Sequence, residues 1–168
     1  MHKRSSSQLW ALAVKTGIIK SNLIPMLAGL MLALYTYNLS FIQHIGDIIL
    51  AVAGTAIVIA SAGIFNNLYD RDIDSIMPRT KTRPSVTGEL GVKTLLIAAI
   101  TFLIVGVVLL YFTTPLAALL GFSGVFFYVV PYTIWTKRRT IWNTEVGSIS
   151  GAMPPLIGWA TVGPDIWH

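Results

Sequence analysis

The chain has 168 residues, of which 54% are hydrophobic and only 11% are charged, whereas a soluble domain carries about 25% charged residues. This composition excludes an ordinary soluble domain and indicates an integral membrane protein. The absence of cysteine also excludes disulfides, thiolate nucleophiles and cysteine-ligated metals.

Apolar blocks of about 20 residues recur along the chain, and this length crosses the hydrocarbon core of a bilayer. A mixed segment that begins at Leu9 precedes the first block and is expected at the membrane interface. The short basic N-terminus lacks the apolar core and cleavage site of a signal peptide, so a bacterial plasma membrane is the expected location. We predict a single all-α domain, a polytopic membrane bundle with about five transmembrane helices, over residues 18–37, 48–67, 94–112, 116–135 and 143–162.

All twelve Lys and Arg residues fall before or at the very start of the first predicted span or in the second and fourth connections, and the first and third connections have none. This alternation satisfies the positive-inside rule, because basic residues favour the cytoplasmic side of a membrane. We therefore expect the N-terminus and the loop over residues 70–91 to be cytoplasmic. The net charge of +5 follows from this topology and gives no reason to expect a nucleic-acid partner.

The second predicted span ends in a cluster of amide and carboxylate side chains. Asn66, Asp70 and Asp74 recur at intervals of four residues, so they share one face if the helix continues through them. Oxygen ligands of this kind, together with substrate phosphates, are those that Mg²⁺ prefers. The pattern therefore predicts a magnesium site at the cytoplasmic mouth of the bundle.

The loop that follows this cluster carries residues suited to phosphate binding. Pro78 and Pro84 bracket three cations, Arg79, Lys81 and Arg83. Proline stiffens the loop, and guanidinium groups bind phosphate oxygens in a bidentate manner. A diphosphate held here would carry a lipid-soluble chain buried between the helices. Because Mg²⁺ and arginine would stabilise the departing diphosphate, the pattern favours prenyl transfer to an electron-rich acceptor.

These motifs resemble those of the intramembrane UbiA-type prenyltransferases. The spacing of Asn66, Asp70 and Asp74 is similar to the first aspartate-rich motif of that superfamily. The arginine–proline loop, together with the Pro-Pro and Gly-Trp pairs within residues 154–159, resembles more specifically its protohaem IX farnesyltransferase branch. The resemblance covers most of the chain from the second predicted span onward.

The resemblance implies transfer of the farnesyl group of farnesyl diphosphate to the 2-vinyl group of haem b, with water supplying the hydroxyl of the product, haem O. It implies Mg²⁺ as the cofactor, a position in the lipid bilayer, and contact with a haem A synthase or a terminal-oxidase assembly. The catalytic and metal-binding residues that carry over by position are Asn66, Asp70 and Asp74. The candidate diphosphate ligands are Arg79, Arg83, Lys137 and Asn67.

Members of this family have about nine spans and a second aspartate-rich motif, and the chain corresponds to their N-terminal part. We therefore expect the chain to be inactive by itself. A UbiA-type enzyme with an aromatic acceptor, such as a quinone or chlorophyll precursor, remains an alternative. So does half of an ion-coupled transporter, although transport predicts polar residues near the bilayer midplane, where the predicted spans have few. A non-catalytic membrane subunit would not depend on Asp70 or Asp74.

Overall fold

The computed structural model describes residues 3–163, and helices account for most of that range. In chain order the elements are α1 (Ser6–Ala13), α2 (Thr16–Thr36), α3 (Ile45–Tyr69), α4 (Arg71–Ile76), α5 (Pro84–Thr87), α6 (Val92–Tyr111), α7 (Pro115–Phe127), the π-helix η1 (Tyr128–Thr136) and α8 (Asn143–Val162). The predicted cytoplasmic loop therefore contains two short helices, α4 and α5.

Four helical segments in the described part of the chain are long and apolar enough to cross a membrane: α2, α3, α6, and the joined segment of α7 and η1. This confirms the predicted all-α membrane bundle. The fifth predicted span coincides with α8, which is not among these four. Carboxylate and hydroxyl side chains in its first half, such as Glu145 and Ser148, lower its hydropathy. By length and hydropathy, four of the five predicted spans are found among the described residues, and α8 as a span stays a prediction.

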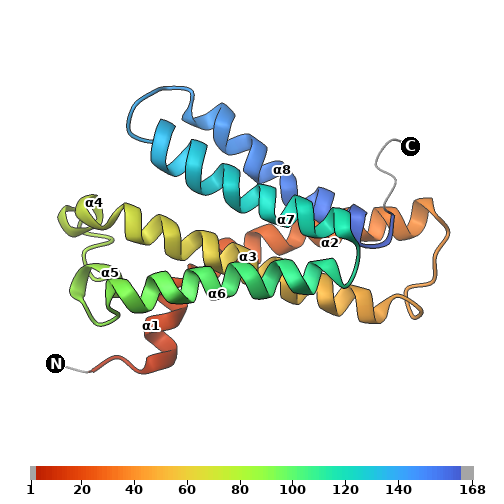
Figure 1. Cartoon of the computed structure of the whole chain (residues 1–168), viewed down its shortest axis with the longest axis horizontal. Coiled ribbons are helices and arrows are strands. Elements are labelled where there is room, and N and C mark those ends of the chain that lie inside the picture. The colour runs from red at the N-terminus through yellow and green to blue at the C-terminus, as the bar shows by residue number, and fades with distance from the viewer. Residues whose placement is uncertain (1–2, 164–168) are drawn as a thin grey trace.

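The two ends of the bundle differ in charge. Figure 1 shows α1, the α4–α5 loop and the loop after η1 at one end, and the turns after α2 and α6 at the other. The loops of the first end carry Lys and Arg, and the turns of the second end carry none. This separation agrees with the alternation in the sequence. The assignment of the basic end to the cytoplasm stays a prediction.

Close contacts between backbones hold the long helices together. A Cβ atom at Gly158 of α8 would lie 1.9 Å from the carbonyl oxygen of Met26 in α2, and one at Gly29 of α2 would lie 2.1 Å from that of Pro155. Small residues at such crossings let membrane helices approach and gain van der Waals contact. The hydroxyl of Ser61 in α3 also donates to the carbonyl oxygen of Ala99 in α6 at 2.7 Å.

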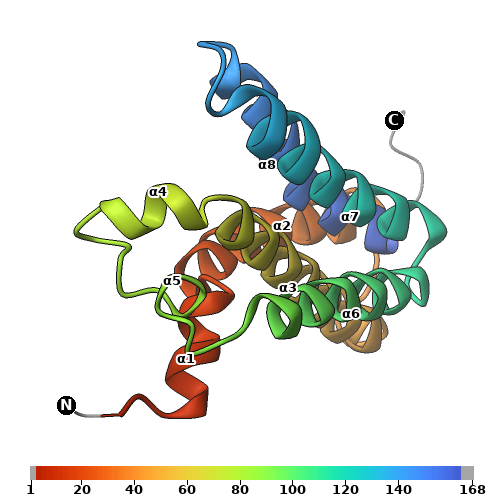
Figure 2. The same cartoon turned by 60° about the vertical axis from the view of Figure 1, so that its left-hand side comes forward.

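The α7–η1 segment changes its winding where Pro131 interrupts it. Proline has no N–H and its ring crowds the preceding turn, so the regular α-helical bonding cannot continue, and wider π turns often occur at functional sites. At the end of η1 the Lys137 N–H donates to the Tyr132 carbonyl oxygen, five residues earlier, at 2.9 Å. Figure 2 shows the α7–α8 pair leaning away from α3 and α6 at the end where α4 lies. This end holds the polar residues singled out above.

Candidate functional site

The predicted aspartate motif lies at the junction of α3 and α4. Asp70 separates the two helices, yet its N–H donates to the Asn66 carbonyl oxygen at 2.9 Å, and the Asp74 N–H donates to the Asp70 carbonyl oxygen at 2.8 Å. Helical spacing thus continues across the break. The three side chains are 1%, 5% and 4% exposed, respectively. The structure brings them together, and their role as metal ligands stays a prediction.

A polar cavity of about 690 Å³ opens beside this junction. Four parts of the chain contribute to its wall: the break between α1 and α2, the α3–α4 junction, the loop that follows α4, and η1 with its end. The cavity brings together six of the seven predicted site residues, Asn66, Asp70, Asp74, Arg79, Arg83 and Lys137. It therefore combines the proposed metal ligands with the proposed phosphate ligands.

Ion pairs join the acidic and basic residues of this cavity. An Arg83 guanidinium nitrogen donates to the Asp74 carboxylate at 2.6 Å, and the Lys137 ammonium forms an ion pair with Asp70. The hydroxyl of Thr80 donates to the Asp74 carbonyl oxygen at 3.0 Å and fixes the start of the basic loop. Both buried carboxylates therefore have a cationic partner, as buried charges require.

Two predicted residues, Asn67 and Arg79, take no part in these ion pairs. Asn67 lies behind the cavity wall, where its amide oxygen accepts from Arg83 at 3.3 Å and its amide nitrogen donates to the Ala13 carbonyl oxygen at 2.9 Å. Arg79 is exposed on the wall and forms no ion pair with a described residue. Asn67 is thus placed to orient Arg83, while the Arg79 guanidinium is available to an incoming anion.

Arg138 was not singled out in the sequence but ties the two basic loops together. Its guanidinium donates to both Asp72 carboxylate oxygens at 2.8 and 2.9 Å and to the Tyr69 carbonyl oxygen at 3.0 Å. It also lies 4.7 Å from the centre of the Tyr69 ring. The hydrogen bond from Arg138 lowers the pKa of Asp72 to about 2. These contacts hold the loop after η1 against the start of α4.

Lys15 is the second residue that the sequence did not reveal. It lies in the break between α1 and α2, with φ 55° and ψ 63°, a left-handed conformation that is uncommon for a residue with a side chain. Its ammonium donates a hydrogen bond to the Asn66 amide oxygen. Burial, together with the nearby charges of Arg83 and Lys137, lowers the pKa of Lys15 to about 8, although Asp70 and Asp74 act in the opposite direction. No motif marks this position, because its role depends on a fold contact across 51 residues.

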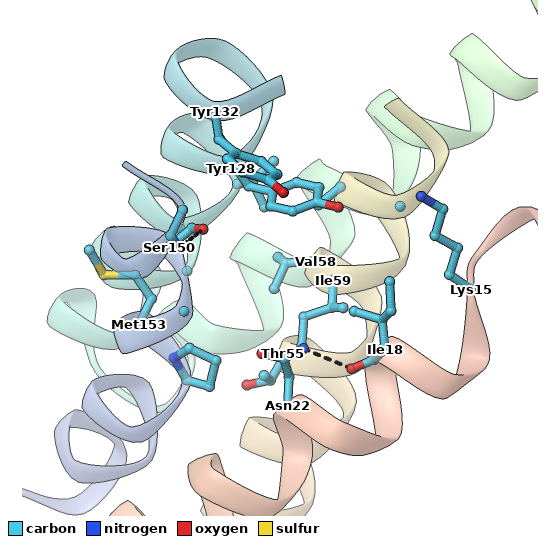
Figure 3. Close-up of a pocket in the computed structure, with 18 of the residues that line it drawn as sticks. Lys15, Ile18, Asn22, Thr55, Val58, Ile59, Tyr128, Tyr132, Ser150 and Met153 are labelled. Carbon is cyan, nitrogen blue, oxygen red and sulfur yellow. Dashed lines mark hydrogen bonds between the residues drawn. The ribbon is translucent and has the colours of Figure 1, made fainter. Parts of the chain in front are cut away.

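An apolar cavity of about 400 Å³ adjoins the polar one between the long helices. Figure 3 shows Tyr128 and Tyr132 at one end of it and Thr55 and Asn22 at the other, with Met153 on the α8 side. The two cavities share the side chains of Lys15, Ile18 and Tyr128 as lining residues. A single molecule with an anionic head and an apolar tail could therefore occupy both.

The π-helix places three side chains that the sequence analysis did not assign. Tyr128 and Tyr132 line the apolar cavity with ring centres 5.4 Å apart. The hydroxyl of Thr133 donates to the Tyr128 carbonyl oxygen at 2.7 Å and accepts from the Asn66 amide nitrogen at 3.4 Å. Pro131 is a signal in the sequence for a change of winding here, but it does not determine where these side chains lie.

The donor atoms fit Mg²⁺ only as part of a metal–diphosphate complex. Within residues 3–163 there is no group of three or more His, Cys, Asp and Glu side chains that could hold a metal ion. Two carboxylates and one amide oxygen are present instead, and all three lie on the polar cavity. Mg²⁺ is commonly bound through one or two carboxylates with substrate phosphates and water completing its shell. The set therefore matches a site that a diphosphate completes.

Comparison with known proteins gives a consistent family assignment. The model of the UbiA prenyltransferase family matches residues 22–168. Protoheme IX farnesyltransferase 2 of Lysinibacillus sphaericus (strain C3-41) is 60% identical over 166 residues, which cover 99% of this chain and 52% of that protein. Protoheme IX farnesyltransferase 1 of Bacillus cytotoxicus is 60% identical over 166 residues, which cover 99% of this chain and 54% of that protein.

A third relative, Protoheme IX farnesyltransferase 2 of Bacillus subtilis (strain 168), is 49% identical over 153 residues, covering 91% of this chain and 50% of that protein. The chain thus spans about half the length of the curated relatives that it matches. No solved structure matches the chain.

Proposed function

Because the chain belongs to the UbiA prenyltransferase family, we propose that the protein containing it transfers a prenyl group from a diphosphate donor to an acceptor in the membrane. More specifically, we propose farnesyl diphosphate as the donor, the 2-vinyl group of haem b as the acceptor and haem O as the product. The names of the relatives support this choice, since they are called protoheme IX farnesyltransferases.

One observation carries the proposal: the polar cavity of about 690 Å³, called the charged cavity from here on, shares a wall with the apolar cavity. The charged cavity presents Arg79, Arg83 and Lys137, which can bind the oxygens of a diphosphate. The apolar cavity extends between the helices toward Thr55, which lies about 16 Å from Asn66 along α3. An isoprenoid chain in the second cavity would keep its diphosphate in the first.

In the proposed reaction the bond between the first prenyl carbon and the diphosphate oxygen breaks, and its electron pair leaves with the diphosphate. Arg83 and Lys137 stabilise the negative charge that develops on the leaving oxygen. Bound Mg²⁺ would add Lewis-acid stabilisation of the same charge. The vinyl group then forms a carbon–carbon bond to the prenyl carbon, which leaves positive charge on the neighbouring vinyl carbon. Water adds to that carbon and loses one proton, so that a hydroxyl remains there.

Besides binding the prenyl chain, the apolar walls would keep water away from the cation-like prenyl carbon until the acceptor captures it. Tyr128 lines both cavities and Tyr132 lines the apolar one, with their rings at the same end of it (Figure 3). The negative face of an aromatic ring attracts positive charge. We assign these two rings to shielding the reacting carbon.

The function is tested with the full-length protein purified in detergent. Incubation with haem b, farnesyl diphosphate and Mg²⁺ is expected to give a farnesylated haem, detected by chromatography and mass. The product should disappear with EDTA and with Asp70→Asn, which removes one proposed metal ligand and the partner of Lys137. Binding of farnesyl diphosphate without haem product would redirect the proposal to an aromatic acceptor. No binding of the diphosphate would contradict prenyl transfer altogether.

The proposed location is the bacterial plasma membrane with the basic end in the cytoplasm. Since the chain has no cysteine, single cysteines can report its orientation without background. A labelling site must be exposed, which excludes buried loop positions such as Ser85, 3% exposed. Lys81 and Ser40 are exposed and lie at opposite ends of the bundle. An impermeant reagent added outside intact cells should label Ser40→Cys and not Lys81→Cys. The reverse pattern would overturn the orientation.

A further inference from the structure

Each of the three side chains of the proposed metal site has a basic partner of its own, besides the 3.4 Å contact of Arg138 with Asp70. The Asp74 carboxylate accepts from Arg83, and the Asp70 carboxylate from Lys137. The Asn66 amide oxygen accepts from Lys15. Two of these cations were assigned above as ligands of the diphosphate. The third, Lys15, completes the pattern but has no role in the reaction as proposed so far.

The position of Lys15 is built by specific contacts. The preceding turn is docked on α3, where the Asn67 amide nitrogen donates to the Ala13 carbonyl oxygen at 2.9 Å. A Cβ atom at Gly63 would lie 3.0 Å from the carbonyl oxygen of Val14, so only glycine lets the turn approach this closely without displacement. The left-handed backbone of Lys15 is held by these contacts. Such strain persists only where the surrounding structure over-determines it.

The ammonium of Lys15 stands where the two cavities meet. Lys15 lines both of them, together with Ile18 and Tyr128. In Figure 3 its side chain extends along the same side of the cavity as α3, toward the level of the two tyrosines. For a prenyl diphosphate that occupies both cavities, this junction coincides with the phosphate next to the prenyl chain. Arg83 and Lys137 line the charged cavity but not the apolar one.

We propose that Lys15 is a direct ligand of the diphosphate, at the phosphate that carries the prenyl chain. When the diphosphate enters, the ammonium exchanges its hydrogen bond with the Asn66 amide oxygen for one with a phosphate oxygen. The same exchange releases the amide oxygen for a cation. This inference rests on the function proposed above, because it requires a diphosphate in the charged cavity.

A double-mutant cycle separates direct binding from a merely structural role. The full-length protein in detergent is titrated with inorganic diphosphate in the presence of Mg²⁺, and the heat of binding is measured. Lys15→Met is expected to weaken binding about tenfold, the effect of losing a charge-assisted hydrogen bond. It should do so equally in the wild-type and Asn66→Ala backgrounds, titrated to saturation in each. Lys20→Met, which changes an exposed lysine on α2, should leave binding unchanged.

Two outcomes would contradict direct binding of the diphosphate by Lys15. If Lys15→Met has no effect in the Asn66→Ala background, Lys15 acts only by holding Asn66 and the inference is wrong. It is equally wrong if Lys15→Met binds as tightly as the wild type. If the wild type binds no diphosphate, the proposed function fails before the inference is reached. An unchanged thermal unfolding midpoint of Lys15→Met in detergent shows that the variant is folded.

Discussion

The two adjoining cavities are built in opposite ways. The charged cavity is made by side chains that reach one another across the fold, such as Lys137 and Asp70, which are 67 residues apart. The apolar cavity is lined mainly by aliphatic, aromatic and small side chains of the long helices, and at Gly151 the missing side chain leaves open space. Charged groups fix the first in place by ion pairing. The second depends on how closely the helices pack.

For the proposed prenyl diphosphate, this difference predicts that the head and the tail of the ligand are recognised separately. The charged cavity should discriminate by charge and be indifferent to chain length. The apolar cavity should discriminate by length and shape and be indifferent to the diphosphate. The substitutions below test this division, since each is expected to damage one cavity and spare the other.

The largest effect is expected from Asp74→Asn. The change removes a proposed metal ligand and leaves the partly buried guanidinium of Arg83 without its 2.6 Å partner. Losing one member of a buried ion pair costs several kcal/mol, so the affinity for inorganic diphosphate with Mg²⁺ should fall by about a hundredfold or more. Calorimetric titration measures this.

Asp47→Asn is the control, because Asp47 pairs with His44 at the opposite end of the bundle. It should leave diphosphate binding unchanged. An Asp74→Asn variant that binds diphosphate like the wild type would remove the α3–α4 junction from the site.

A smaller effect is expected from filling the apolar cavity with Gly151→Leu. A Cβ atom at Gly151 would meet nothing within 4 Å, so the new side chain enters the cavity rather than displacing a helix. Exclusion of part of the prenyl chain should lower the affinity for farnesyl diphosphate about tenfold. The affinity for inorganic diphosphate should not change, and the ratio of the two dissociation constants measures the tail alone.

Gly46→Leu serves as the matched control, because Gly46 is exposed at the start of α3 and also has nothing within 4 Å. If Gly151→Leu weakens the binding of farnesyl diphosphate and of inorganic diphosphate equally, the two cavities do not act independently.

The smallest effect is expected from Arg138→Gln. Arg138 holds Asp72 in a bidentate pair, but Asp72 is 68% exposed, and exposed pairs contribute little. Its contact with the buried Asp70 is long, at 3.4 Å, and Asp70 keeps Lys137 as a partner. We expect the affinity for diphosphate to fall about twofold to threefold as the loop after η1 loosens. Arg139→Gln, which changes the exposed neighbour, should have no effect in the same titration. A tenfold loss in Arg138→Gln would instead place Arg138 among the diphosphate ligands.

The sequence predicted the charged cavity well because charges are scarce in a membrane protein. Asn66, Asp70, Asp74 and the basic loop stand out against apolar spans, and the structure places them around one cavity. The resemblance to the UbiA-type family was equally accessible, since it depends on local motifs that the family match confirms.

The rest of the site depends on packing that local patterns do not encode. Lys15 looked like one of several lysines near the first span, and only the docking of its turn on Gly63 and Asn67 brings it to Asn66. The inward position of Tyr128 follows from a change of winding that Pro131 permits but does not dictate. The apolar cavity has no signature, because a glycine in a membrane helix marks a tight crossing as readily as a cavity.

The amide at position 66 has a consequence for selectivity. A third carboxylate at this position would let the cluster bind divalent cations by itself. The Asn66 amide instead accepts a hydrogen bond from the Lys15 ammonium, so its oxygen has a partner without a metal ion. For the proposed metal–diphosphate complex, the divalent cation and the diphosphate would then promote each other's binding by the same factor, as thermodynamic linkage requires. Free divalent cations would therefore not occupy the cluster by themselves, and the proposed metal site would form only with a bound prenyl diphosphate.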